Sequence, residues 1–354
     1  MGIFDRMEKE GHEEVIFCQE KSTGLKSIIA IHDTTLGPSL GGCRMYPYAT
    51  EEDALNDVLR LSKGMTYKNA ISGSNNGGSK AVIWGDPKDK TEMQFRAFGR
   101  FVGSLNGRFN TGTDVGTYPD DFVWASAESP YFVGLPESYG GSGDTSILTA
   151  DGVMRAVEAC CMEVYGKPDV KGLTVAIQGV GKVGSKLANR LLEKGAKVII
   201  SDISQENVNS FLAKHSGATA VPPDEILATK CDILSPCAMG AVLNEQTVKG
   251  FRCRIICGSA NNQLSEECIG DKINEMGILY APDFLVNAGG AIQVADELEG
   301  FNRARAASKV ERIYDNLLEV FRIAKRDDIP PYRAADRFVE ERIAAAAKIK
   351  TIHL

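Results

Sequence analysis

The chain has 354 residues, of which 43% are hydrophobic and 25% are charged, a composition typical of a soluble globular protein with more than one domain. Its formal net charge of −7 argues against nucleic acid as a main partner. It contains no apolar run of about eighteen residues, and its N-terminus lacks the apolar core of a signal peptide, so we expect no membrane partner and a cytoplasmic location.

The first part of the chain alternates short β-branched runs with helical patterns. Residues 27–31 and 81–84 have the composition of strands. Between them, residues 50–53 have the form of a capping box, and the apolar residues that follow at three- and four-residue spacing predict a helix ending near Gly64. The stretch 134–143, rich in glycine, proline and serine, is typical of a hinge or a domain boundary.

The second part of the chain alternates strands and helices, which predicts a doubly wound parallel sheet. A helix over 149–165 leads into it. The candidate strands are residues 174–178, 198–202, 219–221, 231–235, 254–257 and 278–280. Further helices are predicted near 287–299, 304–326 and 332–349. We expect this long tail to pack back onto the first domain and to brace a cleft between the two domains.

A glycine motif follows the first strand of this sheet. Gly179 suits the tight turn, Gly181 lets the backbone approach a pyrophosphate, and Gly184 lets the helix pack closely on the sheet. The next strand ends at Asp202, 18 residues past Gly184, near the offset of about 20 residues at which a carboxylate accepts hydrogen bonds from the adenosine ribose. A carboxylate there repels a 2′-phosphate, so the motif predicts NAD; the alternative is a helix-capping or solvated aspartate. The predicted contacts are Gly179, Val180, Gly181, Lys182, Val183, Gly184 and Asp202.

Cysteine and histidine residues are arranged in no pattern that indicates chemistry. The nine cysteines include no Cys-x-x-Cys pair and no histidine beside them, so we expect free buried thiols and no metal site. The four histidines stand in no motif that requires an acid or a base. Proton chemistry is therefore expected from lysines and carboxylates.

Two lysines, Lys68 and Lys80, lie twelve residues apart at the ends of the segments Gly-Met-Thr-Tyr-Lys and Gly-Gly-Ser-Lys. Such a pair indicates a site that binds a carboxylate with one cation and lowers the pKa of the other. The alternative for any single lysine is a solvated cation. Together with the dinucleotide motif, the pair predicts an enzyme that moves hydride.

Several motifs in one order resemble the leucine/phenylalanine branch of the amino-acid dehydrogenases, within the glutamate dehydrogenase superfamily, over nearly the whole chain. The motifs are residues 31–38, 41–45, 60–68, 105–109, 113–117, 236–238, 260–264 and 287–290. The resemblance implies reversible oxidative deamination of an L-amino acid to a 2-oxo acid and ammonia, with NAD as hydride acceptor. It also implies a homo-oligomer formed through the N-terminal domain.

The resemblance implies an α/β fold in which successive segments of the chain form domains with different functions. Residues 1–143 form a substrate and oligomerisation domain, residues 144–330 an NAD-binding Rossmann domain, and residues 331–354 a C-terminal helical segment that returns to the first domain.

The resemblance also assigns roles to the polar residues. Lys68 holds the substrate α-carboxylate, helped by Asn261 or Asn262. Lys80, close to Lys68, activates the water that adds to the imino acid, and Asp114 shuttles protons to and from the substrate nitrogen. The further cofactor contacts are Arg44 at the phosphates, Asp114, Ser146 and Thr149 near the nicotinamide ribose and carboxamide, and Ala238, Met239 and Asn261 beyond two strand ends. For Thr149 and Met239, a helix cap and core filler are the alternatives.

The side-chain pocket that the resemblance implies is lined by Leu40, Gly41, Met65, Gly112, Ala288, Ala291 and Val294. Phenylalanine-type enzymes tend to have Thr-Gly-Thr-Asp, as residues 111–114 do, where leucine-type enzymes carry alanine in place of Gly112. Valine or leucine is usual in place of Ala291, so both positions are expected to widen the pocket. L-phenylalanine is therefore the expected substrate, with leucine or tryptophan as alternatives.

One residue departs from the family. Ser79 stands where relatives usually have the third glycine before the catalytic lysine. If that glycine is needed for a positive φ, serine would cost about 1 kcal/mol or more and displace Lys80. Ser79 is the one feature in favour of a rival hypothesis, a catalytically inactive protein that senses NAD.

Overall fold

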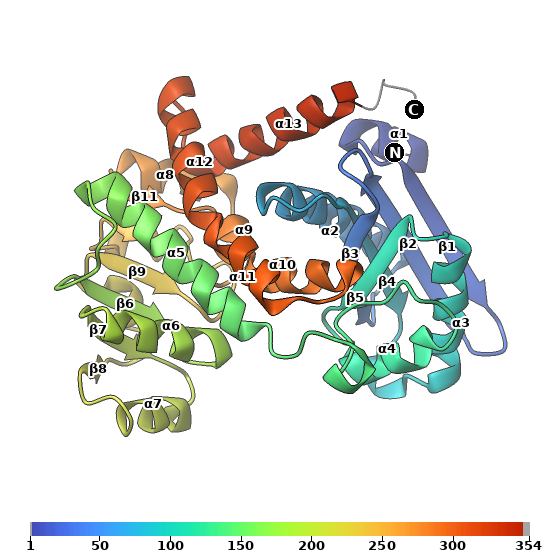
Figure 1. Cartoon of the computed structure of the whole chain (residues 1–354), viewed down its shortest axis with the longest axis horizontal. Coiled ribbons are helices and arrows are strands. Elements are labelled where there is room, and N and C mark those ends of the chain that lie inside the picture. The colour runs from blue at the N-terminus through green and yellow to red at the C-terminus, as the bar shows by residue number, and fades with distance from the viewer. Residues whose placement is uncertain (1, 350–354) are drawn as a thin grey trace. The chain divides into compact units, whose positions relative to one another are not determined.

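A computed structural model describes residues 2–349, which form two compact units (Figure 1). The first unit contains the described residues up to Gly143, then Ala291–Ala306, and then the residues from Val339 onward. The second contains Asp144–Gly290 and Ala307–Phe338. The chain thus enters the first unit three times. Of the C-terminal segment predicted over 331–354, residues 350–354 lie outside the described residues.

The first unit is built on a five-stranded mixed sheet with the order β1-β2-β4-β3-β5. Strand β2 is antiparallel to both β1 and β4, whereas β3 is parallel to both β4 and β5. Its elements are α1 (Ile3–Glu10), β1 (Glu14–Glu20), β2 (Leu25–Asp33), β3 (Ser39–Tyr46), α2 (Glu51–Ile71), β4 (Gly77–Trp84), α3 (Glu92–Ser104), β5 (Phe109–Thr113) and α4 (Pro119–Ser126). Because β3 is parallel to two neighbours, the chain must cross from β3 through α2 to reach β4.

Helix α2 is the element that brings the lysine motif to the sheet. It begins with the predicted capping box, in which the Asp53 N–H donates to Thr50 Oγ1 (3.1 Å) and the Thr50 N–H donates to Asp53 Oδ2 (3.1 Å). Its apolar face, which includes Leu55 and Val58, packs with Val82 of β4. The other face of the sheet packs on α3 and α4 through phenylalanines such as Phe95. The predicted helix end at Gly64 is wrong, because α2 continues to Ile71.

The second unit contains a six-stranded parallel sheet with the order β11-β10-β9-β6-β7-β8, as predicted for a doubly wound fold. Its elements are α5 (Ser146–Tyr165), β6 (Thr174–Gln178), α6 (Lys182–Glu193), β7 (Lys197–Ser201), α7 (Gln205–Leu212), β8 (Ala218–Ala220), β9 (Ile233–Pro236), β10 (Ile255–Ile256), α8 (Glu267–Glu275), β11 (Leu279–Tyr280), α9 (Asp283–Val286) and α12 (Ile313–Asp327). Strand order reverses between β6 and β9, and in such sheets ligands bind at the carboxyl ends of the strands at this point.

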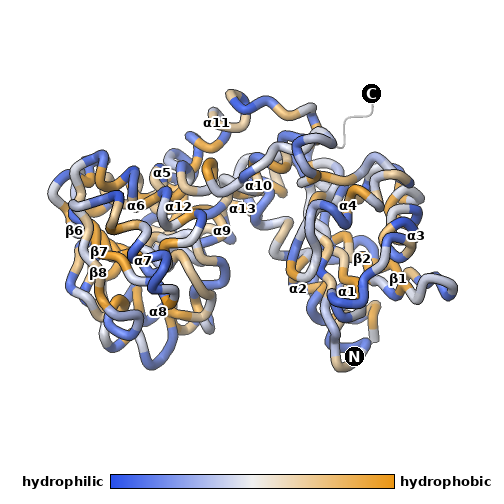
Figure 2. The backbone as a smooth tube through the Cα atoms, turned by 90° about the horizontal axis from the view of Figure 1, so that it is seen from below, coloured by the Kyte–Doolittle hydropathy of each residue, from blue (hydrophilic) through white to orange (hydrophobic). Residues whose placement is uncertain are grey.

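Hydrophobic residues run along β7, whereas α7 is mostly hydrophilic (Figure 2). This contrast is expected, because a parallel strand is buried on both faces and a surface helix on one side only.

Three helices belong to both units: α10 (Gly289–Asp296), α11 (Arg303–Glu311) and α13 (Pro331–Ile349). The single helix predicted over 304–326 is wrong in detail, since it is interrupted at Arg312 into α11 and α12. Within residues 2–349, no helix is long and apolar enough to cross a membrane.

Candidate active site

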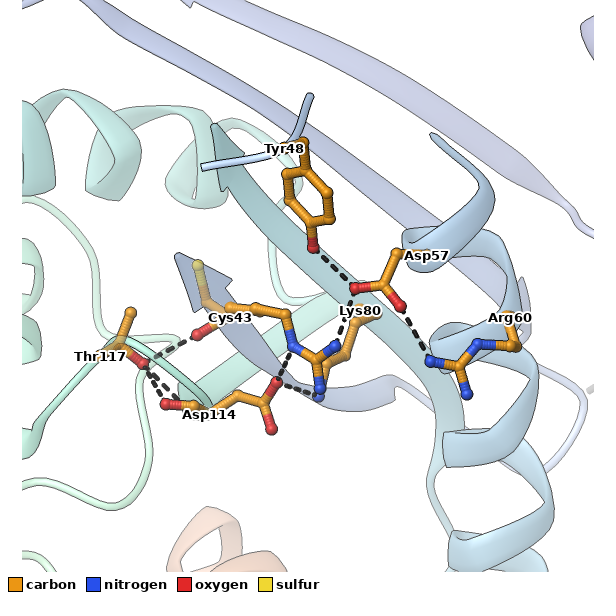
Figure 3. A network of polar contacts seen from close by, with 8 residues as sticks. Cys43, Tyr48, Asp57, Arg60, Lys80, Asp114 and Thr117 are labelled. Carbon is orange, nitrogen blue, oxygen red and sulfur yellow. Dashed lines mark hydrogen bonds and ion pairs between the residues drawn. The ribbon is translucent and has the colours of Figure 1, made fainter. Parts of the chain in front are cut away.

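Lys80 is a buried lysine of β4, with 5% of its surface exposed. Its neighbour Ala81 packs into the cluster on the α3 side of the sheet, while Val82 packs against α2. Because strand residues alternate between faces, Lys80 emerges on the α2 side. Its Nζ lies 3.2 Å from Oδ2 of Asp114, directly after β5 (Figure 3). The alternative of a solvated surface lysine is therefore excluded.

Gly42 makes this ion pair possible. Strand β3 lies between β4 and β5, so the Lys80 side chain must pass over β3 to reach Asp114. A Cβ on Gly42 would lie 3.2 Å from Lys80 Nζ, 3.1 Å from the Asp114 Cβ and 2.8 Å from the Thr113 carbonyl oxygen. The sequence shows Gly42 only as part of a motif, and its role depends on the strand order.

Arg44 is the second cation at Asp114. Its Nε donates to Asp114 Oδ2 (2.9 Å), and its Nη1 donates to Asp57 Oδ2 (2.8 Å). Asp57 also accepts hydrogen bonds from the Tyr48 hydroxyl (2.7 Å) and from Arg60 (2.9 Å), as Figure 3 shows. Arg44 was predicted at the cofactor phosphates; in the first unit its guanidinium is shared between two carboxylates.

The backbone of Asp114 is fixed by Thr117. The Asp114 N–H donates to Thr117 Oγ1 (2.9 Å), and this hydroxyl donates to the Cys43 carbonyl (2.8 Å) in β3. The turn after β5 is thereby tied to the strand beside it, which holds the carboxylate in front of Lys80 (Figure 3).

The electrostatic environment lowers the pKa of both Lys80 and Asp114. Burial lowers the pKa of the Lys80 ammonium and the Arg44 guanidinium lowers it further, while Asp114 acts in the opposite direction. Burial raises the pKa of Asp114, but the charges of Lys80 and Arg44 outweigh it and hold that pKa below its usual value. An amine with a lowered pKa next to a carboxylate suits proton transfer near neutral to alkaline pH.

Lys68 lies half-buried in the last turn of α2, the helix that packs against β4. The adjacent residue Asn69 is buried and donates to the carbonyl oxygens of Leu40 (2.9 Å) and Gly77 (2.7 Å). These two bonds tie α2 to β3 and β4 next to Lys68. Sequence reasoning missed Asn69, although an asparagine beside the predicted carboxylate-binding lysine was visible.

The first unit also holds most of the predicted pocket residues. Leu40 is buried on β3, and a Cβ on Gly41 would lie 3.3 Å from Met65 Cγ. Ala291 and Val294 are half-buried on α10.

The expectation that Gly112 widens the pocket is not supported. A Cβ on Gly112 would lie 2.9 Å from the Val133 carbonyl oxygen and 3.2 Å from Val133 Cγ2, so protein atoms fill that space. The cause is the bridge between Thr111 and Phe132, which places residues 132–133 beside β5.

Ser79 does not strain the backbone. It lies within β4, paired with Ile31 of β2, and its φ is not positive. The condition for a backbone cost and a displacement of Lys80, a positive φ at this position, is therefore not met. Its hydroxyl is buried and has no hydrogen-bond partner among the described residues, so the cost of serine here comes from desolvation.

The glycine motif of the second unit has the predicted geometry. Gly179, with φ of +93°, makes the turn after β6, and Gly181 is the N-cap of α6. A Cβ on Gly184 would collide with the Gly179 carbonyl, which explains the close packing of helix and turn. A Cβ on Gly181 would have no atom of the described residues within 4 Å, so the space beside this N-cap residue is open. Lys182, Val183 and Gly184 form the first turn of α6, and Val180 precedes Gly181.

Asp202 follows β7 and braces the glycine turn. Its Oδ2 accepts the Val180 N–H (2.8 Å), and its Oδ1 accepts the N–H of Ser204 (2.8 Å), which is the N-cap of α7. Asp202 is therefore neither the helix cap nor a freely solvated residue.

The other predicted contacts of the second unit lie at its helix starts and strand ends. Ser146 and Thr149 are in the first turn of α5, where the Thr149 hydroxyl donates to the Thr145 carbonyl (2.9 Å); it is not the N-cap, which is Thr145. Ala238 and Met239 follow β9, and Met239 is 70% exposed, so core filler is wrong for it. Asn261, Asn262 and Ala288, predicted as substrate contacts, also belong to the second unit, whereas Lys68 and Lys80 belong to the first.

The described residues include no group of three or more His, Cys, Asp or Glu side chains arranged to hold a metal. All nine cysteines are free, as predicted, but only five of them are buried: Cys231, Cys237 and Cys253 are half-buried and Cys268 is exposed.

Most of the chain matches two domain models of one dehydrogenase family. Residues 12–131 match the Glu/Leu/Phe/Val dehydrogenase dimerisation domain, and residues 140–205 and 200–349 match Glutamate/Leucine/Phenylalanine/Valine dehydrogenase. The leucine dehydrogenase of Thermoactinomyces intermedius is 52% identical over 100% of this chain and 97% of its own length. The phenylalanine dehydrogenase of the same organism is 53% identical over 99% and 97%.

A solved structure gives the same result. The L-tryptophan dehydrogenase from Nostoc punctiforme superimposes with a TM-score of 0.91 at 41% identity, over 98% of this chain and 100% of the other. The sequence motifs, the two sheets and these similarities all indicate the same family. The chain belongs to the glutamate/leucine/phenylalanine/valine dehydrogenase family, in its leucine/phenylalanine branch.

Proposed function

We propose that the protein catalyses the NAD-dependent, reversible oxidative deamination of an apolar L-amino acid, L-phenylalanine first among them, to its 2-oxo acid and ammonia. The observation that carries this proposal is the ion pair between buried Lys80 and Asp114. Lys80 Nζ lies 3.2 Å from Asp114 Oδ2, and the absence of a side chain at Gly42 leaves room for this contact. A lysine with a lowered pKa and an ionised carboxylate supply the two proton-transfer groups that this reaction requires.

Each polar group of the first unit has one task in the proposed reaction. Lys68 binds the substrate carboxylate, since a charge-assisted contact offsets the cost of removing that carboxylate from water. Asp114 accepts a proton from the substrate ammonium and returns it to the departing ammonia. Neutral Lys80 takes a proton from the water whose oxygen bonds to the imino carbon, and the carbon–nitrogen bond then breaks.

The second unit supports NAD as the cofactor, which when bound accepts the hydride from the substrate α-carbon. Gly181 leaves open space at the start of α6, where backbone N–H groups attract a pyrophosphate. Asp202 lies against the same turn and favours a ribose hydroxyl over a 2′-phosphate. Ser146, Thr149, Ala238, Met239 and Asn261 remain the predicted further contacts in this unit, and Arg44 remains one from the first.

The substrate side chain is the least constrained part of the proposal. Ala291, which is half-buried on α10, still favours a large substrate side chain, because the family resemblance implies valine or leucine at this position in most relatives. Leucine is the second candidate, since Val133 occupies the space that Gly112 was expected to open and the leucine and phenylalanine dehydrogenases are equally similar to this chain.

A substrate screen tests the proposal. NADH formation is followed with L-phenylalanine, L-leucine and L-tryptophan, each with the wild type and with Lys80→Ala. We expect the highest kcat/KM with L-phenylalanine. Higher kcat/KM with L-leucine would assign the second candidate, and no turnover of any amino acid would favour the inactive, NAD-sensing alternative, whose one supporting feature, Ser79, leaves the strand unstrained.

The match to a dimerisation domain over residues 12–131 supports a homo-oligomer formed through the first unit. Light scattering on the purified protein tests this, and a monomer at micromolar concentration would contradict it. Cytoplasmic location remains a prediction.

A further inference from the structure

Asp57 is a carboxylate that neither the motifs nor the proposed reaction uses. It lies on α2, in the half that was predicted only to pack, and its side chain is 16% exposed. It accepts three hydrogen bonds: from the Tyr48 hydroxyl, from Arg44 Nη1 and from Arg60 Nη2. Two of these donors are fixed by the fold, since Tyr48 is buried and Arg44 belongs to β3. A carboxylate held this way is a firm anchor for the arginine (Figure 3).

The contacts form a line of alternating charges that ends at Lys80. The order is Arg60, Asp57, Arg44, Asp114 and Lys80, with each neighbouring pair joined by an ion pair of 2.8 to 3.2 Å. Two arginines and two aspartates balance one another when Lys80 is neutral, whereas a protonated Lys80 leaves one positive charge in excess. Because most of these side chains are shielded from water, an excess positive charge among them lowers the pKa of Lys80.

Arg44 is shared between its two carboxylates. Its Nε donates a hydrogen bond to Asp114, and its Nη1 donates one to Asp57. A guanidinium prefers to place two parallel N–H groups on one carboxylate. Without Asp57, Arg44 is free to turn both N–H groups onto Asp114, where it competes with the Lys80 ammonium for Oδ2.

We propose that Asp57 is a positioning residue of the active site, which anchors Arg44 and thereby leaves Asp114 available to Lys80. The inference rests on the proposed function of Lys80 as the base. It assigns a task to a residue of α2 that is 23 positions from Lys80 in the sequence and whose hydrogen bonds go to Arg44, Tyr48 and Arg60.

The proposal predicts pH shifts of opposite sign for two neighbouring substitutions. In Asp57→Asn, the positive charge of Arg44 is uncompensated and Asp114 is drawn away, so Lys80 loses its proton at lower pH. In Arg44→Gln, a like charge is removed and Asp114 pairs with Lys80 alone, so Lys80 keeps its proton to higher pH. We expect each variant to shift the acid limb of kcat/KM for the amino acid by about 0.5 pH unit or more.

The other charged and titratable groups near Lys80 are the same residues in both variants, and of these only Asp114 is expected to change its position. Asp114 and Cys43 lie beside it on or after neighbouring strands, and Lys68 lies on α2. The titration of the substrate amine is also common to all the profiles. A shift therefore reports on the change at Asp57 or Arg44, provided that NAD is kept saturating for each variant.

Two further variants control for charge and structure. Glu52→Gln removes a negative charge from the same helix at an exposed position paired with Arg6, and it should leave the profile unchanged. Asp57→Glu keeps the charge, so its profile should stay at the wild-type position even if kcat falls. A merely structural role for Asp57 would lower activity at every pH in both Asp57 variants.

Shifts of the two expected signs support the proposal, and either variant is sufficient if the other does not fold. Unshifted profiles, or shifts in the same direction, overturn it. This failure is distinct from failure of the proposed function: if Lys80→Ala retains the wild-type kcat, the role of Lys80 itself is wrong, whereas a Lys80-dependent enzyme with unshifted profiles contradicts only the role of Asp57.

Discussion

Replacing Gly42 by alanine tests whether the crossing of Lys80 over β3 is what assembles the site. The added Cβ would lie 2.8 Å from the Thr113 carbonyl oxygen, which is backbone and cannot rotate away. It would also lie 3.2 Å from Lys80 Nζ and 3.1 Å from the Asp114 Cβ, so the end of β5 and the lysine must both move. We expect a stability loss of about 1–3 kcal/mol from overpacking.

The catalytic effect should exceed the effect on stability. A displacement of about 1 Å between reacting groups costs roughly 10²-fold in rate, so kcat for deamination in Gly42→Ala should fall by about that factor. Gly64→Ala is the matched control, because Gly64 is exposed on α2 and a Cβ there meets no described atom within 4 Å. That control should gain about 0.5–1 kcal/mol and keep its kcat. A Gly42→Ala enzyme with wild-type kcat and stability would refute the reasoning.

Three further predictions address the cofactor, the pocket and acid stability. Asp202 should give NAD at least a tenfold higher kcat/KM than NADP, since tenfold needs only about 1.4 kcal/mol, and equal values would show that Asp202 does not face the ribose. Ala291→Leu should narrow the pocket and lower the ratio of phenylalanine to leucine activity, with tryptophan affected most; an unchanged ratio contradicts the assignment. Burial lowers the pKa of His12 to about 4, with His32 adding to the effect, so folding favours neutral His12 and its stability contribution, up to about 3 kcal/mol, is lost as pH falls from 6.5 toward 4. Urea unfolding at pH 7.5 and pH 5 should show this loss in the wild type and in His215→Gln but less of it in His12→Gln, where burial still lowers the pKa of His32.

The sequence predicts the second unit better than the first. Strand β6 has the predicted bounds, and the other five strands are displaced or shortened by one or two residues, because a parallel sheet needs a regular alternation of apolar strands and helices. The break at Arg312 was missed because no glycine or proline marks it. In the first unit, the mixed order of the strands depends on pairing between distant segments, which no local pattern specifies.

The same difference separates the site residues that could be predicted from those that could not. Lys80 and Asp114 are recognisable because they stand in motifs. Gly42, Asp57 and Tyr48 gain their meaning only when β3 is placed between β4 and β5 and α2 is laid on the sheet. The sequence also cannot show whether a glycine such as Gly112 leaves free space, because that depends on which neighbouring segment packs against it.

The most direct test of the central claim is kcat for L-phenylalanine deamination by Lys80→Ala and by Lys68→Ala, with NAD binding measured separately by fluorescence. Lys80→Ala should lower kcat by roughly 10²-fold or more with NAD affinity unchanged, because it removes a positioned base. Lys68→Ala should act mainly on KM, since a charge-assisted carboxylate contact is worth about 1.5–3 kcal/mol. A Lys80→Ala enzyme that keeps near-normal kcat would contradict the account.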